Sequence, residues 1–209
     1  MSNGASGPML YIPFSTIFSE LRCYAMNQSK QRFFIALVPP PDIEQHITEI
    51  QQYFAEHYNS RGALKSPPHI TLQPPFHWLA EDVPKLEESL NQFSVNRRPI
   101  PVTLSSFATF APRVIYVDVV KSPELLEIHS YLMSYMEANL GIVDRVSQSR
   151  PFVPHMTVAF RDLTKENFQR AWLEFAGRSL HFEFTASALT LLIHDGSRWN
   201  ISNQFPLSA

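Results

Sequence analysis

Two segments of this chain of 209 residues repeat one pattern of residue types. Pro68–Leu72 reads Pro-His-Ile-Thr-Leu, and Pro154–Val158 reads Pro-His-Met-Thr-Val. Each copy joins an imidazole, which titrates near neutral pH and can give or take a proton, to a hydroxyl, which can hydrogen-bond an anion. Two such pairs suit a reaction in which one histidine takes a proton at one bond while the other gives a proton at another.

Both copies have the alternation of a short β-strand, with apolar residues at every second position. Side chains on a strand point to opposite faces in turn, so Ile70 and Leu72 should face a core. His69 and Thr71 then share the opposite face, about 7 Å apart along the strand. The second copy predicts the same arrangement.

A tetrahedral anion between the two imidazoles would complete this arrangement, because the hydroxyls could hold its non-bridging oxygens while the histidines move protons. That fits phosphoryl chemistry, in which positioning and charge stabilisation supply most of the catalysis. Catalytic zinc usually has three protein ligands, and neither copy supplies a second His or a carboxylate at a usual spacing, so we expect no metal and no other cofactor. The candidate catalytic residues are His69, Thr71, His155 and Thr157.

The composition is that of a globular protein, with 44% hydrophobic, 12% aromatic and 17% charged residues. A net charge of -2 gives no broad basic face for duplex nucleic acid, which favours a nucleotide or a short RNA end as the partner. The single cysteine, Cys23, cannot form an internal disulfide, and no apolar run is long enough to span a bilayer. We therefore expect a cytoplasmic monomer without a membrane segment.

Predicted helices and strands are interspersed around the two copies, so that each copy follows one helix and precedes another. This order predicts an α+β fold of two lobes related by a pseudo-twofold axis, with the two His-Thr strands facing each other across a cleft. The expected helices lie near 43–54, 86–93, 123–140 and 164–177, and the expected strands near 32–38, 69–75, 101–110, 114–120, 155–159, 180–184, 188–194 and 199–205.

The chain divides into an N-terminal extension, residues 1–30, and a single bilobal domain, residues 31–209. The extension begins with Ser, Asn and Gly and then carries an isolated apolar patch around Met9–Phe18 without clear periodicity. We expect it to be disordered or loosely packed.

The two His-x-Thr-x phrases, in an α+β chain of this size, resemble the 2H phosphoesterase superfamily, and in particular the bacterial 2'-5' RNA ligase/cyclic phosphodiesterase family. The resemblance covers about residues 32–205, and the four candidate catalytic residues fall on the motif positions. It implies two antiparallel sheets with helices packed outside and a central cleft. It also implies metal-independent hydrolysis of 2',3'-cyclic phosphates or 2'-5' bonds at the ends of RNA or of nucleotides.

The match to the family is interrupted five residues after His155. Some RNA ligase members carry an arginine there, whereas this chain has Phe160, followed by Arg161. On a regular strand a shift by one residue turns the side chain to the opposite face. The auxiliary role of that arginine, and ligase activity with it, is therefore not carried over, although Arg161 stays a candidate substrate contact.

Other candidate substrate contacts lie near the two copies. Cations there could contact a phosphate or be solvated surface groups. Aromatic residues could stack on a base or fill the core, and Tyr116 is better placed than Phe110 or Trp199 because it lies between the two copies. With Arg161, the candidate substrate-binding residues are Lys65, Phe76, Arg113, Tyr116 and Arg150.

Two other functions fit the same residues. A module that binds nucleotides or RNA ends with little turnover would keep the cleft, although the presence of both histidines and both threonines favours chemistry. A phosphodiesterase for a cyclic phosphate outside RNA, such as one derived from ADP-ribose, would use the same four groups.

Overall fold

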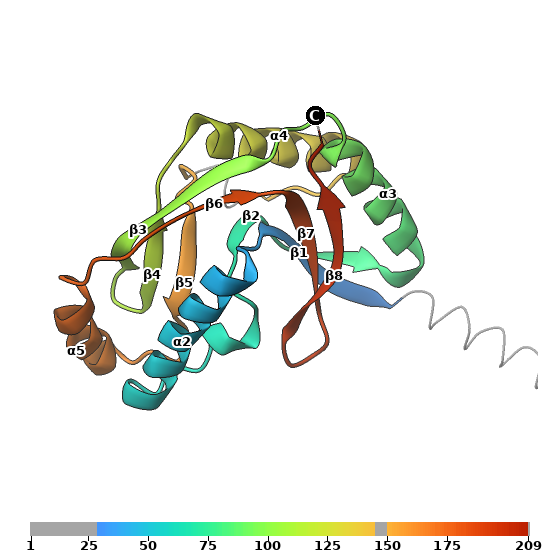
Figure 1. The fold of residues 1–209 in the computed structure, drawn as a ribbon. Coiled ribbons are helices and arrows are strands. Elements are labelled where there is room, and N and C mark those ends of the chain that lie inside the picture. Colours follow the sequence, from blue (N-terminus) through green and yellow to red (C-terminus); the bar gives the residue numbers. More distant parts are fainter. Residues whose placement is uncertain (1–28, 145–149, 209) are drawn as a thin grey trace, which may run out of the picture.

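The computed structural model describes residues 29–144 and 150–208 (Figure 1). Most of the N-terminal extension therefore lies outside the described residues, and the first strand begins at Lys30. In chain order the main elements are β1 (Lys30–Leu37), α2 (Pro41–His57), β2 (Ile70–Leu79), α3 (Val83–Ser94), β3 (Ile100–Phe110), β4 (Val114–Val119), α4 (Pro123–Leu140), β5 (His155–Ala159), α5 (Lys165–Phe175), β6 (His181–Ala186), β7 (Ala188–His194) and β8 (Trp199–Pro206). Short 3-10 helices, η1 (Ala63–Lys65) and η2 (Ala80–Asp82), flank β2.

The ends of α4 and α5 are set by local signals in the sequence. The Ser122 side chain accepts a hydrogen bond from the Leu125 backbone amide at the start of α4, and Gly141 ends that helix with a φ of 66°. A left-handed residue at this position is best supplied by glycine, which has no Cβ. Thr164 caps α5 by accepting from the Asn167 amide. Both helices begin where the sequence predicts them.

The eight strands form one antiparallel sheet in the order β6-β3-β4-β5-β2-β1-β7-β8. The α+β class is as predicted, but the two expected sheets are joined into one. A single residue pair, Ile70 with Met156, makes the junction between β2 and β5. Both side chains are fully buried in the same core, which brings the two strands within pairing distance. The joined sheet is curled, with helices packed outside it (Figure 1).

The junction divides the sheet into two sets of four strands. The His69 half consists of β2, β1, β7 and β8, and the His155 half of β5, β4, β3 and β6. These halves interleave in the sequence, because the C-terminal strands β7 and β8 return to pair beside β1. Each half therefore contributes four strands on its own side of the junction, although the two halves are not separate segments of the chain.

Strand β2 runs past the two prolines at which it was expected to end. It continues from Pro74 and Pro75 to Leu79, paired with β1 on one side. Its other neighbour, β5, pairs with it only at Ile70, so the far edge of β2 is free beyond that point. Proline is tolerated on such an edge, where its missing N–H breaks no ladder.

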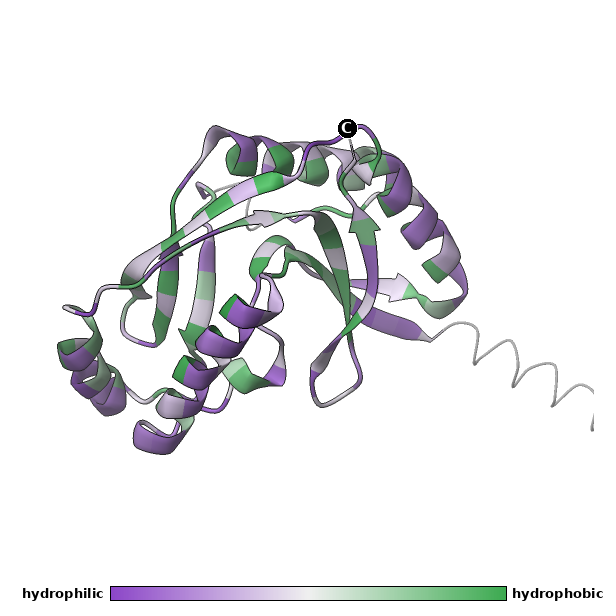
Figure 2. Ribbon diagram, in the orientation of Figure 1, coloured by the Kyte–Doolittle hydropathy of each residue, from purple (hydrophilic) through white to green (hydrophobic). Residues whose placement is uncertain are grey.

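The helices bury apolar side chains against the larger of two clusters of buried apolar residues. Helix α2 buries Ile43, Ile47 and Phe54, spaced for one helix face. On α3 the outward side is mostly hydrophilic (Figure 2). None of the helices in the described part of the chain combines the length and hydropathy that crossing a membrane requires.

Candidate active site

The junction of the two halves brings both copies of the repeated pattern together. Because β2 and β5 are antiparallel and Ile70 pairs with Met156, His69 lies beside Thr157 and Thr71 lies beside His155. All four side chains line one cleft, the central cleft, with a volume of about 430 Å³. Each histidine is thus a neighbour of the threonine from the other copy.

The two imidazoles are held in the same way. Nδ1 of His69 lies 2.7 Å from the carbonyl oxygen of Pro67, and Nδ1 of His155 lies 2.7 Å from that of Val153. A carbonyl oxygen only accepts, so Nδ1 carries the proton and donates it in both cases. Each Nε2 is then the atom left to take or give a proton in the central cleft.

The electrostatic surroundings of the two histidines differ. Burial lowers the pKa of His69 to about 4, against the hydrogen bond to Pro67, and the neighbouring His155 lowers it further. Burial also lowers the pKa of His155, but the hydrogen bond to Val153 and the charge of Asp118 both oppose this shift. Asp118 is the cross-strand partner of His155 on β4. The protonated form is therefore better supported at His155.

Aromatic rings pack against both imidazoles. The ring of Phe34 lies 4.7 Å from that of His69, and the ring of Phe110 meets His155 edge-on at 5.0 Å. The ring of Tyr116 lies 5.2 Å from that of His155, and Tyr116 is only 5% exposed. These contacts fix the ring planes and remove water from around the two groups, which accounts for the lowered pKa values.

Three cationic side chains line the central cleft: Arg32, Lys65 and Arg161. Arg161 reaches it because β5 ends at Ala159. The strand alternation that would turn the side chain of Arg161 to the opposite face has therefore already stopped. Arg161 itself has a φ of 61°, so the chain bends there, and both Phe160 and Arg161 line the cleft. The alternation of a regular strand, on which the sequence argument relied, does not extend to this position.

The other residues that were predicted to contact the substrate do not line the central cleft. Phe76 packs against Phe33 at the edge of the core, and Arg113 is exposed in the β3–β4 turn. Arg150 lines an adjoining pocket that shares Thr71 and His155 with the central cleft. Neither Phe76, Arg113 nor Tyr116 is among the residues that line the cleft itself.

Sequence analysis missed several residues that line the central cleft. Arg32 and Phe34 come from β1, whose alternate side chains face the cleft, and Arg32 lies over the Trp199 ring at 5.2 Å. Strand alternation puts both on one face of β1, and the pairing of Ala36 with Thr71 makes this the face of His69. His194 also lines the cleft, and it comes from the far end of the chain, beyond any spacing signal.

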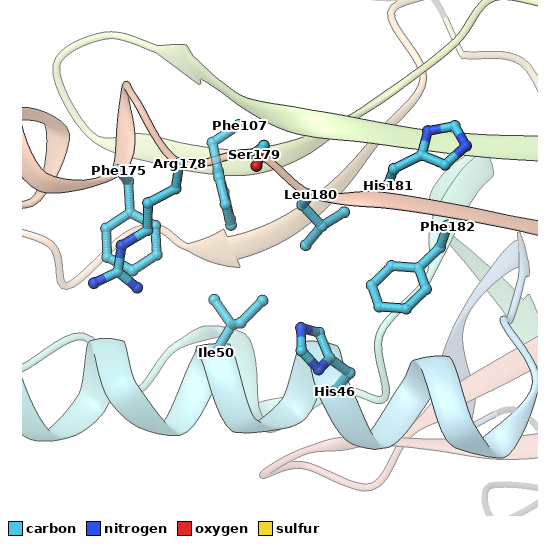
Figure 3. Close-up of a pocket in the computed structure, with 9 residues that line it drawn as sticks. All are labelled: His46, Ile50, Phe107, Phe175, Arg178, Ser179, Leu180, His181 and Phe182. Carbon is cyan, nitrogen blue, oxygen red and sulfur yellow. The ribbon is translucent and has the colours of Figure 1, made fainter.

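A second large cavity lies between α2 and the segment that leads into β6 (Figure 3). Its volume is about 420 Å³, and its walls are mainly apolar, with Ile50 and His46 rising from α2 toward Phe107 and Phe182. His46 packs edge-on against Phe182 at 5.1 Å. The cavity contains none of the four motif residues, so the matched His-Thr pairs single out the central cleft. Across residues 29–144 and 150–208, no three His, Cys, Asp or Glu side chains gather closely enough to hold a metal ion.

A curled antiparallel sheet that brings two His-x-Thr pairs into one cleft is the architecture of a 2H phosphoesterase. The chain belongs to the 2'-5' RNA ligase superfamily, whose family model matches residues 39–198. It is 30% identical over 178 residues to "Putative phosphoesterase GK0864" of Geobacillus kaustophilus, which covers 83% of this chain and 95% of the relative. A similarly named protein of Bacillus licheniformis is 25% identical over 181 residues, or 85% of this chain and 99% of the relative. The family and these names indicate a phosphoesterase.

Solved structures show the same fold at low sequence identity. A crystal structure of E. coli LigT complexed with 3'-AMP gives a TM-score of 0.60 at 19% identity and covers 87% of this chain and 100% of that one. TT0787 of Thermus thermophilus gives 0.59 at 18% identity, with 84% and 97% covered. The fold of this chain is therefore shared with LigT over most of both chains.

Proposed function

We propose that this protein is a metal-independent phosphoesterase that cleaves 2',3'-cyclic phosphates or 2'-5' phosphodiester bonds at the ends of RNA or of nucleotides. One observation carries the proposal: two histidines, each with Nδ1 engaged by a carbonyl, share one cleft with two threonines. The family supports a phosphoester substrate, and the structures of LigT with 3'-AMP and with phosphate support a nucleotide.

His69 acts as the base and His155 as the acid in this scheme. The low pKa of His69 keeps its Nε2 unprotonated near neutral pH, whereas Asp118 favours a proton on His155. For a cyclic phosphate, a water oxygen forms the new bond to phosphorus and gives its proton to His69. The bond from phosphorus to one ribose oxygen breaks, and His155 gives that oxygen a proton. The two histidines supply both proton transfers, so no metal-bound water is required.

The threonines and cations hold the phosphate. The hydroxyls of Thr71 and Thr157 donate to the non-bridging oxygens, whose charge grows in the transition state. Arg161 and Lys65 supply positive charge in the same cleft and contact the phosphate or its neighbour. Trp199, whose ring lies 4.6 Å from that of Phe34, offers a face for a base.

Turnover of nucleoside 2',3'-cyclic phosphates in the presence of EDTA tests the proposal. We expect the wild-type protein to release a single nucleotide product, identified as the 2'- or 3'-phosphate, and the H69A and H155A variants to lose that activity. H46A is the matched control, because His46 lies on α2 in the other cavity and should leave turnover unchanged. Tight binding of nucleotides without turnover by the wild type would instead identify a binding module, and turnover confined to cyclic phosphates outside RNA would redefine the substrate.

A further inference from the structure

Arg161, one of the cations that line the central cleft, has a backbone conformation that arginine rarely adopts. Its φ is 61°, and the amide of Asp162 donates to the carbonyl oxygen of Phe160 over 2.8 Å, which closes a tight turn around Arg161. The guanidinium lies 5.1 Å from the centre of the Phe160 ring. A positive φ is strained for a residue with a Cβ, so surrounding contacts must hold this turn in place.

The side chain of Asp162 ties the turn to a segment that is distant in the sequence. The Ser60 hydroxyl donates to one carboxylate oxygen of Asp162 over 2.9 Å, and the backbone amide of Arg61 donates to the other over 2.7 Å. Ser60 is fully buried, and its own amide donates to the carbonyl oxygen of Phe54 in the last turn of α2. The turn at 160–162 is therefore anchored to a helix that packs into the core.

Gly62 allows the two segments to meet closely. A Cβ at this position would lie 3.0 Å from the carbonyl oxygen of Phe160 and 3.2 Å from Oδ1 of Asp162, which is tighter than ordinary packing. The φ of Gly62 is -60°, which any residue can adopt. The missing side chain of Gly62 thus serves the close approach of the two segments, and both segments line the central cleft.

An acidic residue in the wall of a phosphate site needs a physical reason. Asp162 is exposed and lines the central cleft, where its negative charge opposes the binding of an anion. Both of its oxygens accept hydrogen bonds from residues 60 and 61. The roles of base and acid already belong to His69 and His155. These observations favour a role for Asp162 in holding the turn over a direct role in proton transfer.

We propose that Asp162 is a positioning residue: its carboxylate fastens the turn at 160–162 to residues 60–62 and so holds the guanidinium of Arg161 at the substrate phosphate. This inference rests on the proposed function, because it takes a phosphate in the central cleft as given. Arg161 holds the phosphate equally before and during the reaction. Releasing the turn should therefore raise KM and leave kcat nearly unchanged.

Asparagine and alanine at position 162 separate the hydrogen bonds from the charge. In D162N the amide oxygen can accept from the Arg61 amide, and the amide NH2 can donate to the Ser60 hydroxyl, which also accepts. D162N therefore keeps both hydrogen bonds without the charge, whereas D162A keeps neither. With adenosine 2',3'-cyclic phosphate we expect D162A to raise KM about tenfold and to leave kcat within about twofold. D162N should keep KM within about threefold of the wild-type value.

Two further variants test whether Asp162 acts through Arg161. T164A is the matched control, because it removes the hydrogen bond that Thr164 accepts from the Asn167 amide in the same loop and leaves residues 60–62 untouched. It should keep KM within about twofold. In an R161A protein the guanidinium is already gone, so adding D162A should change KM by less than about twofold.

Binding of 3'-AMP, measured by calorimetry, gives a second measurement that does not require turnover, and its Kd should follow the same order as KM. Neither quantity depends on the fraction of folded protein. Equal effects of D162N and D162A, an undiminished effect of D162A in the R161A protein, or a T164A protein that matches D162A would each overturn the inference.

The same measurements keep the inference apart from the proposed function. A wild-type protein that binds 3'-AMP and does not turn over the cyclic phosphate would overturn the proposed function, and the Kd values would then decide the inference alone. A wild-type protein that neither binds 3'-AMP nor turns over the cyclic phosphate would overturn both.

Discussion

The two halves of the sheet hold their histidines with the same backbone and surround them with different side chains. In both halves Nδ1 donates to the carbonyl two residues earlier, over 2.7 Å. The strand that pairs with each motif strand then differs at one position. Val117 pairs with Met156 and is followed by Asp118, whereas Leu37 pairs with Ile70 and is followed by Val38. One half therefore has a carboxylate near its imidazole where the other has an apolar group.

This difference separates what the repeated pattern fixes from what its neighbours fix. The pattern positions two Nε2 atoms and two hydroxyls. The paired strands decide which imidazole holds a proton, because a nearby carboxylate favours the charged form and apolar surroundings disfavour it. The following predictions test that division, beginning with the largest effect.

Removing either imidazole should abolish most of the activity, because both halves are needed for one reaction. We expect H69A and H155A each to lower kcat by about 100- to 10,000-fold, the usual contribution of a general acid or base. The H69A/H155A double variant should be scarcely worse than either single variant, because the two residues act as a unit. Steady-state kinetics with a cyclic phosphate measures this. A multiplicative loss in the double variant would show that the histidines act independently.

Removing one hydroxyl should cost less, and by a similar factor in the two halves. We expect T71V and T157V each to lower kcat by about a hundredfold, since each deletes one donor to the developing charge while keeping the shape of the side chain. T185V, on the exposed face of the edge strand β6, is the matched control. A loss in only one of the two threonine variants would break the symmetry of the phosphate site.

Asp118 should set the basic side of the pH profile. The productive state has His69 neutral, which holds above its pKa of about 4, and His155 protonated, which holds below a pKa that lies under the usual 6.5. We therefore expect kcat/KM to peak in the mildly acidic range. D118N removes the charge that supports the proton on His155 and should move the basic limb to lower pH by about 0.5 to 1 unit. An unchanged basic limb would mean that His155 is not the acid.

Placing a carboxylate in the other half should have the smallest effect, and it should move the acidic limb of the pH profile rather than the basic limb. V38D puts an acid at the position that corresponds to Asp118, where it should raise the pKa of His69 and move the acidic limb to higher pH by less than about one unit. The shift is small because Val38 lies beyond the last paired residues of β1. The basic limb should stay in place, and a shift of that limb instead would reverse the assignment of acid and base.

The sequence predicted those parts of the fold that depend on short-range signals. Helix α4 has the expected bounds because Ser122, Pro123 and Gly141 mark its ends. The two motif strands follow from alternation alone. The junction of the two sheets could not be predicted, because it depends on one pair of residues far apart in the chain, Ile70 and Met156.

The four motif residues lie together in the central cleft, and the groups around them were harder to predict from sequence. Arg161 reaches the cleft through a bend with positive φ, a conformation that the presence of an arginine does not predict. Arg32 and His194 come from strands that become neighbours of β2 only in the folded sheet. Loop geometry and long-range strand order, rather than local spacing, decide these contacts.

The pairing of each histidine with the threonine of the other copy has a genetic consequence. In a homodimer with this geometry, one substitution would alter both copies of the site at once, so an acid and a base could not be tuned apart. A single chain that contains both copies is free of that constraint. A change such as the aspartate at position 118 alters one imidazole and leaves the other as it was, which lets a twofold scaffold perform a reaction that has a direction.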